Sequence, residues 1–85
     1  MINLTQRTYN EINTELAKRI ASLRKRKKLS QSKLAKRSGV SFGSVKRFEQ
    51  TGEISLASLT KIAIALEVET ELDTLFSDVP FDSIE

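Results

Sequence analysis

Residues 30–52 constrain the fold of this chain more than any other stretch of the sequence. Ser30 and Ser41 each precede a short helical pattern, and a serine hydroxyl there accepts an otherwise unpaired amide of the opening helical turn. Gly39 separates the two patterns and suits the left-handed backbone that ends one helix and redirects the chain. The stretch therefore predicts two short helices joined by a tight turn.

The apolar residues of these two helices fall on one side of each. Leu34 and Ala35 form the inner face of the first helix, and Val45 and Phe48 form that of the second. The second helix keeps a polar outer side that the core does not need. This arrangement predicts a helix-turn-helix whose second helix can enter the major groove of DNA.

The distribution of charge points to the same kind of partner. The net charge at pH 7 is only +3, but residues 18–47 hold twelve basic side chains and no acid. Residues 49–85 hold nine acids, with Lys61 as their single basic residue. A solvated charged surface is usually mixed in sign, so an uninterrupted basic run indicates a polyanionic partner.

Composition excludes several other classes of protein. The sequence has no cysteine and no histidine, so thiol chemistry, thiolate metal sites and the commonest general base are absent. Its acids belong to no motif that pairs them with a nucleophile. No apolar run approaches the roughly 20 residues of a membrane span, and no signal-peptide pattern follows Met1. We expect a cytoplasmic, non-enzymatic protein without cofactor, metal or membrane contact.

The remaining sequence completes one small domain. Thr8 and Glu11 form a predicted capping box for a helix that ends near Lys27. Ser55 is expected to cap a fourth helix. We divide the 85 residues into a flexible N-terminal segment (1–10), a folded domain (11–76) and a C-terminal tail (77–85).

The last element has two interpretations. Val68, Leu72, Leu75 and Phe76 have the spacing of a short fifth helix. An alternation typical of an edge strand is also present, since acids at 69, 71 and 73 separate Val68, Thr70, Leu72 and Thr74. The predicted fold class is all-α, a compact domain of four to five helices, with a short C-terminal strand at a dimer interface as the alternative.

The string Ser-Gln-Ser-Lys-Leu-Ala-Lys-Arg-Ser-Gly-Val-Ser, followed by Val-Lys-Arg-Phe-Glu, resembles the phage Cro/repressor-type (XRE-like) helix-turn-helix family. The resemblance covers residues 16–76. It implies a sequence-specific regulator of transcription that binds double-stranded DNA, namely a dimeric repressor that inserts the helix near residues 42–50 into a palindromic operator. The segment Glu-Gln-Thr-Gly-Glu-Ile-Ser is also similar to Hip-type antitoxins, which implies an alternative: an antitoxin that neutralises a protein toxin and autoregulates its operon.

The resemblance places the base contacts at Phe42, Gly43, Ser44 and Arg47. The planar fork of Arg47 can bridge O6 and N7 of guanine. Phe42 either packs on a thymine methyl group or folds back beside Val40. Gly43 either admits close approach of the backbone to a base or merely weakens the helix.

The resemblance also implies contacts to the DNA backbone. Gln31 is expected to bind a phosphate and brace the second helix, unless it is a solvated residue without a partner. Arg24 and Glu49 match an internal ion pair that positions the arginine, unless they are two solvated charges. The expected phosphate contacts are Arg24, Gln31, Lys33, Lys36, Arg37, Ser41, Lys46, Thr51 and Ser55.

Three apolar residues, Leu72, Leu75 and Phe76, are expected to close the core or form a two-fold dimer interface. A monomer that reads about four or five base pairs cannot define a genomic site, so we expect a homodimer.

Overall fold

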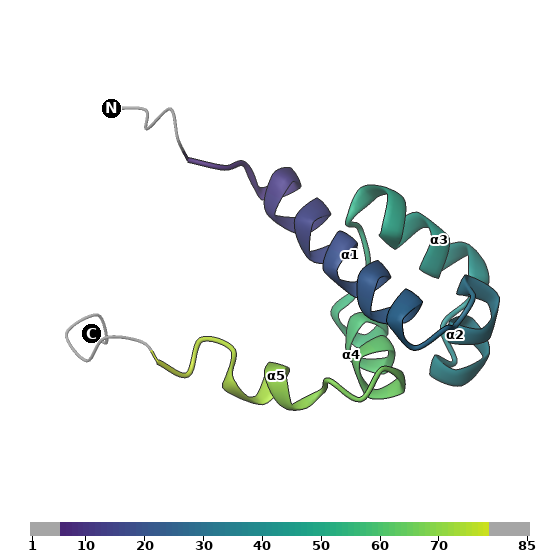
Figure 1. Ribbon diagram of the computed structural model, residues 1–85. Helices are drawn as coiled ribbons and strands as arrows, with labels where there is room; N and C mark the ends of the chain where they lie inside the picture. Colours follow the sequence, from purple (N-terminus) through teal and green to yellow (C-terminus); the bar gives the residue numbers. More distant parts are fainter. Residues whose placement is uncertain (1–5, 79–85) are drawn as a thin grey trace.

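The computed structural model describes residues 6–78, and within that range it contains five helices and no strand (Figure 1). The helices are α1 (Tyr9–Arg26), α2 (Gln31–Ser38), α3 (Phe42–Thr51), α4 (Leu56–Ala65) and α5 (Thr70–Thr74). The predicted all-α class is therefore confirmed.

Helices α1 to α4 begin at the residues that the sequence marks as caps. The side chains of Thr8, Ser30, Ser41 and Ser55 each accept a hydrogen bond from the amide three residues further on. At Thr8 the capping box is complete, because its own amide donates to the Glu11 carboxylate at 2.8 Å. That backbone hydrogen bond also lowers the pKa of Glu11 below its ordinary value of 4.5.

The core lies where α2 and α3 pack on each other, with α1 packed against α3 and α4 packed against α2. Its largest fully buried side chains are Phe48, Leu34, Ile62, Leu66 and Val45. Burial of side chains of this size stabilises a fold by about 1.5–3 kcal/mol each. The helix-turn-helix is thus part of the core and not an appendage to it.

Two glycines set the ends of α2 and α3. Gly39 and Gly52 have φ angles of +77° and +79°, the left-handed region in which a side chain is strained. Gly52 is also buried, and a Cβ atom there would lie 2.8 Å from the backbone carbon of Asn13 in α1. The end of α3 is therefore packed tightly against the first helix.

The edge-strand interpretation of residues 68–74 is wrong. The amides of Glu71 and Leu72 donate to carbonyls three residues earlier, those of Val68 and Glu69, so local helical bonds satisfy this backbone. Helix α5 leads away from α2 and α3 (Figure 1).

The predicted segment boundaries and the predicted absence of a membrane span are the next points of comparison. Helix α1 begins at Tyr9, whereas the predicted domain begins at residue 11, and the proposed division into segments stays a prediction. Residues 1–5 and 79–85, which include parts of both predicted terminal segments, lie outside the described residues. In residues 6–78 no helix has the length and apolar character needed to cross a membrane.

Candidate nucleic-acid interface

The outer side of α3 is open to solvent. Val45 and Phe48 turn inward and are buried, whereas Ser44, Lys46 and Arg47 are exposed. Because the inner residues fix the rotation of the helix, the same polar side chains always face outward. The helix can therefore present them to a partner without losing any part of the core.

A buried ion pair holds α3 against α1. Arg24 Nε donates to Glu49 Oε2 at 2.7 Å, and Nη2 donates to Oε1 at 2.9 Å. The remaining guanidinium nitrogen, Nη1, donates to the carbonyl of Leu29 at 2.8 Å. From α2, Gln31 Nε2 donates to Glu49 Oε1 at 2.9 Å. We call Arg24, Gln31 and Glu49 the α3 brace.

The α3 brace sets the charge state of Glu49. The Arg24 and Glu49 side chains keep only 10% and 7% of their surface exposed. Burial by itself would raise the pKa of Glu49, but the hydrogen bonds from Arg24 and Gln31 and the positive charges of Arg24 and Lys25 outweigh it. The pKa of Glu49 therefore lies below its ordinary value of 4.5, and the carboxylate is ionised at neutral pH.

The brace decides between alternatives that the sequence left open. The predicted ion pair between Arg24 and Glu49 is confirmed, and neither residue is a solvated charge. Gln31 has a partner on α3, as predicted for a bracing residue. The burial of Arg24 does not favour a direct contact with phosphate, since its three nitrogens already donate to protein acceptors.

The predicted base-reading residues lie together on the first two turns of α3. Phe42 is half-exposed (49%) and Val40 is buried, which leaves both interpretations of Phe42 open. Gly43 has no positive φ, and a Cβ atom there would meet nothing within 4 Å. The fold therefore gives no internal reason for a glycine at this position.

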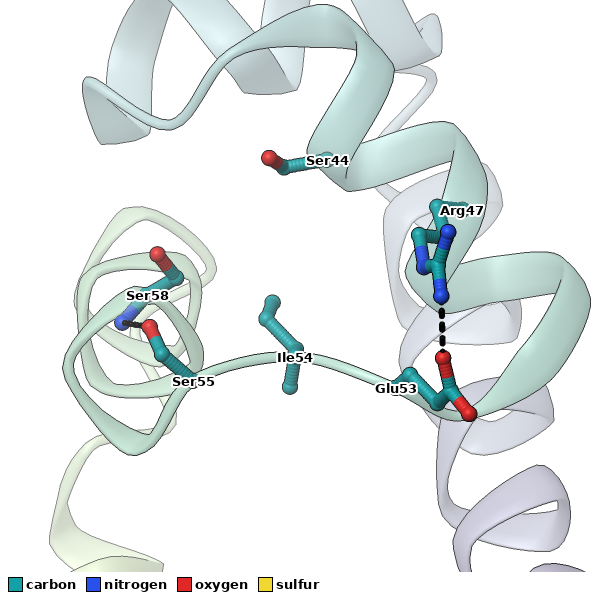
Figure 2. A pocket seen from close by; sticks show the side chains of 6 residues that line it. All are labelled: Ser44, Arg47, Glu53, Ile54, Ser55 and Ser58. Atoms are coloured by element: carbon teal, nitrogen blue, oxygen red, sulfur yellow. Dashed lines mark hydrogen bonds and ion pairs between the residues drawn. The ribbon is translucent and has the colours of Figure 1, made fainter.

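Arg47 has a neighbour that the sequence reasoning missed. Its Nη2 forms an ion pair with Oε1 of Glu53, in the loop between α3 and α4 (Figure 2). Both residues line a shallow, open hollow between α3 and the start of α4, together with Ser44, Ile54, Ser55 and Ser58. The only signal in the sequence was an acid directly after the glycine that ends α3.

The predicted phosphate contacts are distributed over three helices. Lys33, Lys36 and Arg37 are exposed on α2, and Lys46 is exposed on α3. The hydroxyls of Ser41 and Ser55 cap α3 and α4. Thr51 Oγ1 donates to the Arg47 carbonyl at 2.8 Å.

The predicted dimer residues lie at the far end of the described chain. Leu72 is half-buried, whereas Leu75 and Phe76 are exposed to 56% and 81%. The last two are therefore not core residues of this chain.

Two short helices at a glycine turn, with a braced second helix that shows its polar side to solvent, define a helix-turn-helix domain. A family model described as Helix-turn-helix (HTH_3) matches residues 20–72, which is more than half of the chain, so the protein belongs to this helix-turn-helix family. The predicted Cro/repressor-type (XRE-like) family is thereby confirmed, and the protein is a DNA-binding regulator of transcription. No curated protein matches the sequence.

Proposed function

We propose that this protein is a dimeric repressor that inserts α3 into the major groove of a palindromic operator and blocks transcription by occupying that site. The observation that carries the proposal is the α3 brace. It buries Glu49 of α3 against Arg24 of α1 and Gln31 of α2. A recognition helix that is fixed in this way loses little conformational entropy when it docks.

In this proposal Phe42, Gly43, Ser44 and Arg47 contact base edges. All four are exposed at the start of α3, where helix-turn-helix proteins read the groove. Arg47 is the main base reader, because an arginine fork matches O6 and N7 of guanine. The missing side chain at Gly43 allows a close approach of the helix to the DNA.

Phosphate contacts come from the exposed cations Lys33, Lys36, Arg37 and Lys46. Gln31 is partly exposed and contributes its amide, and Ser41, Thr51 and Ser55 contribute hydroxyl or backbone groups. We propose that Arg24 acts on DNA binding indirectly, by orienting α3.

The dimer interface of the proposal consists of Leu72, Leu75 and Phe76. The exposure of Leu75 and Phe76 supports it, because large apolar side chains gain by leaving water. Two-fold symmetry would place two copies of α3 about 34 Å apart, in successive turns of the major groove.

Selection from a pool of randomised duplexes tests the proposal. At about 0.15 M salt, where contacts to phosphate alone are weakened, we expect enrichment of a palindrome with half-sites about one helical turn apart. Arg47→Ala should relax the preference at one position of each half-site. Lys36→Ala should weaken binding to all duplexes alike and lower the salt slope by about one unit. A pool without any enriched sequence contradicts the proposal.

One observation favours the alternative, an antitoxin that neutralises a protein toxin and autoregulates its operon. Exposed Leu75 and Phe76 follow the acids Glu69, Glu71 and Asp73, which together suit a basic protein partner. Salt-sensitive binding to every duplex, without an enriched palindrome, would support an antitoxin whose specific binding to DNA depends on its partner.

A further inference from the structure

Glu53 has an unusual position for an acid in this protein. It lies in the loop directly after α3, whose own exposed charges, Lys46 and Arg47, are positive. An acid beside a surface that binds DNA repels phosphate and so weakens binding to DNA. A function of Glu53 would explain why an acid is nevertheless found there. Its contact is with Arg47, the residue to which we assign base reading.

The backbone around Glu53 is held in place. Thr51 Oγ1 accepts a hydrogen bond from the Glu53 amide at 3.1 Å and donates to the Arg47 carbonyl at 2.8 Å. Between them, buried Gly52 packs directly on Asn13 of α1. The loop therefore carries the Glu53 carboxylate to the side of Arg47 and keeps it there.

The ion pair leaves most of the guanidinium available. Its contact uses Nη2, and 68% of the Arg47 side chain and 59% of the Glu53 side chain remain exposed. The other two guanidinium nitrogens, Nε and Nη1, can still donate hydrogen bonds to a base. The pair as a whole is electrically neutral, so it attracts phosphate less than a free arginine does.

We propose that Glu53 is a positioning residue that determines specificity: it remains paired with Arg47 in the DNA complex, directs the guanidinium toward base edges and cancels its attraction for phosphate. A free arginine has many rotamers and binds any phosphate oxygen within reach. A paired arginine has fewer rotamers and gains mainly where a base offers acceptors. This inference rests on the proposed base contact of Arg47.

The test compares binding of the full chain to the selected operator and to a random-sequence duplex, by fluorescence anisotropy from about 50 to 200 mM salt. Glu53→Gln removes the charge and keeps the shape. We expect binding to the random duplex to tighten by about 1.5-fold to fivefold, which is the range of an exposed ion pair, with no tightening on the operator. The salt slope on the random duplex should steepen by about one unit, because Arg47 becomes free to bind phosphate.

Two control variants separate this role from a general charge effect. Glu67→Gln removes an acid from the exposed Lys27–Glu67 ion pair, which involves no residue of α3, and should leave the ratio of the two affinities unchanged. Glu53→Gln in an Arg47→Ala background should leave that ratio unchanged as well, because its partner is absent.

The inference predicts that Glu53→Gln lowers the ratio of operator affinity to random-duplex affinity. Three results would overturn it: an unchanged or higher ratio in Glu53→Gln, an equal fall in Glu67→Gln, or the same fall when Arg47 is missing. A wild-type protein that prefers no operator refutes the proposed function itself. A clear wild-type preference that Glu53→Gln does not alter refutes the role of Glu53 alone.

Discussion

Glu49 accepts three hydrogen bonds, two from Arg24 and one from Gln31, while its side chain is almost completely removed from water. An ion pair of this kind gives little net stability compared with apolar residues of the same size. Loss of one partner is much more costly, because the other charge then stays buried without compensation. The brace thus stabilises one orientation of α3, and the loss of any one of its residues destabilises the fold.

Arg24→Met is expected to lower the free energy of unfolding by about 3–5 kcal/mol, because it leaves the Glu49 carboxylate buried and unpaired. Lys27→Met is the matched control. It removes a cation from the exposed Lys27–Glu67 pair and should change the free energy by less than about 1 kcal/mol. Urea unfolding measures both variants. Equal losses would show that the brace is energetically an ordinary surface pair.

Glu49 also predicts how stability depends on pH. Its pKa in the folded protein is lower than the ordinary value of 4.5, so the unfolded chain binds its proton more readily. The contribution of Glu49 is therefore fully present above pH 4.5 and is lost as the pH falls through the folded-state pKa.

Urea unfolding at a series of pH values below neutrality tests this sign. Wild-type protein should lose stability below pH 4.5 more steeply than Glu49→Gln, which has no such proton to bind. The remaining slope in that variant includes Glu11, whose pKa is also lowered. Parallel curves for the two proteins would contradict the assignment to Glu49.

Among the elements, those with local signals were predictable. Thr8, Ser30, Ser41 and Ser55 mark helix starts because a cap depends only on neighbouring residues. The identity of α5 was not fixed by its pattern, because five residues can satisfy a helical or an alternating spacing equally well. Hydrogen bonds within the segment decided it.

The candidate site was predictable only in part. The α3 brace was expected through the family resemblance, since its partners lie on three helices and no spacing rule connects them. The contact between Arg47 and Glu53 was missed, because it depends on the path of the loop after Gly52. That path is fixed by packing against Asn13, a residue about forty positions earlier in the sequence. Long-range packing of this kind leaves no local pattern.

The two helix-ending glycines give a prediction about these elements. In Gly39→Ala the new methyl group meets no neighbour, but alanine is strained at this positive φ, so the free energy of unfolding should fall by about 1–2 kcal/mol. Gly52→Ala adds a clash with the Asn13 backbone at 2.8 Å and should cost clearly more. Chemical unfolding of both proteins gives the comparison. A smaller loss for Gly52→Ala would mean that the loop moves easily away from α1.

At the scale of the whole molecule, the chain separates most of its basic residues from most of its acids. The basic run ends in α3, whereas seven of the eleven acids follow α4, as do the exposed residues Leu75 and Phe76. One end of the protein is therefore suited to DNA and the other to a protein surface. In the proposed function, DNA and the second subunit therefore contact different residues.

Phe76→Ser is expected to weaken the proposed dimer by about tenfold or more, because buried aromatic residues dominate most interfaces. Leu56→Ser is the matched control, since Leu56 on α4 is similarly exposed (74% against 81%) but outside the proposed interface. Sedimentation equilibrium over a range of protein concentrations distinguishes the variants. Dissociation by Leu56→Ser, or none by Phe76→Ser, would place the interface elsewhere.

The α3 brace has a consequence for protein engineering. Residues 30–52 look like a module that can be transplanted, because they contain both helices and both caps. Their Glu49, however, is neutralised from outside, by Arg24 of α1. A chimera that receives these residues alone inherits a carboxylate without its counter-charge. A host that already covers the buried faces of α2 and α3 therefore also has to supply a partner for Glu49, either α1 or a neutral residue in place of Glu49.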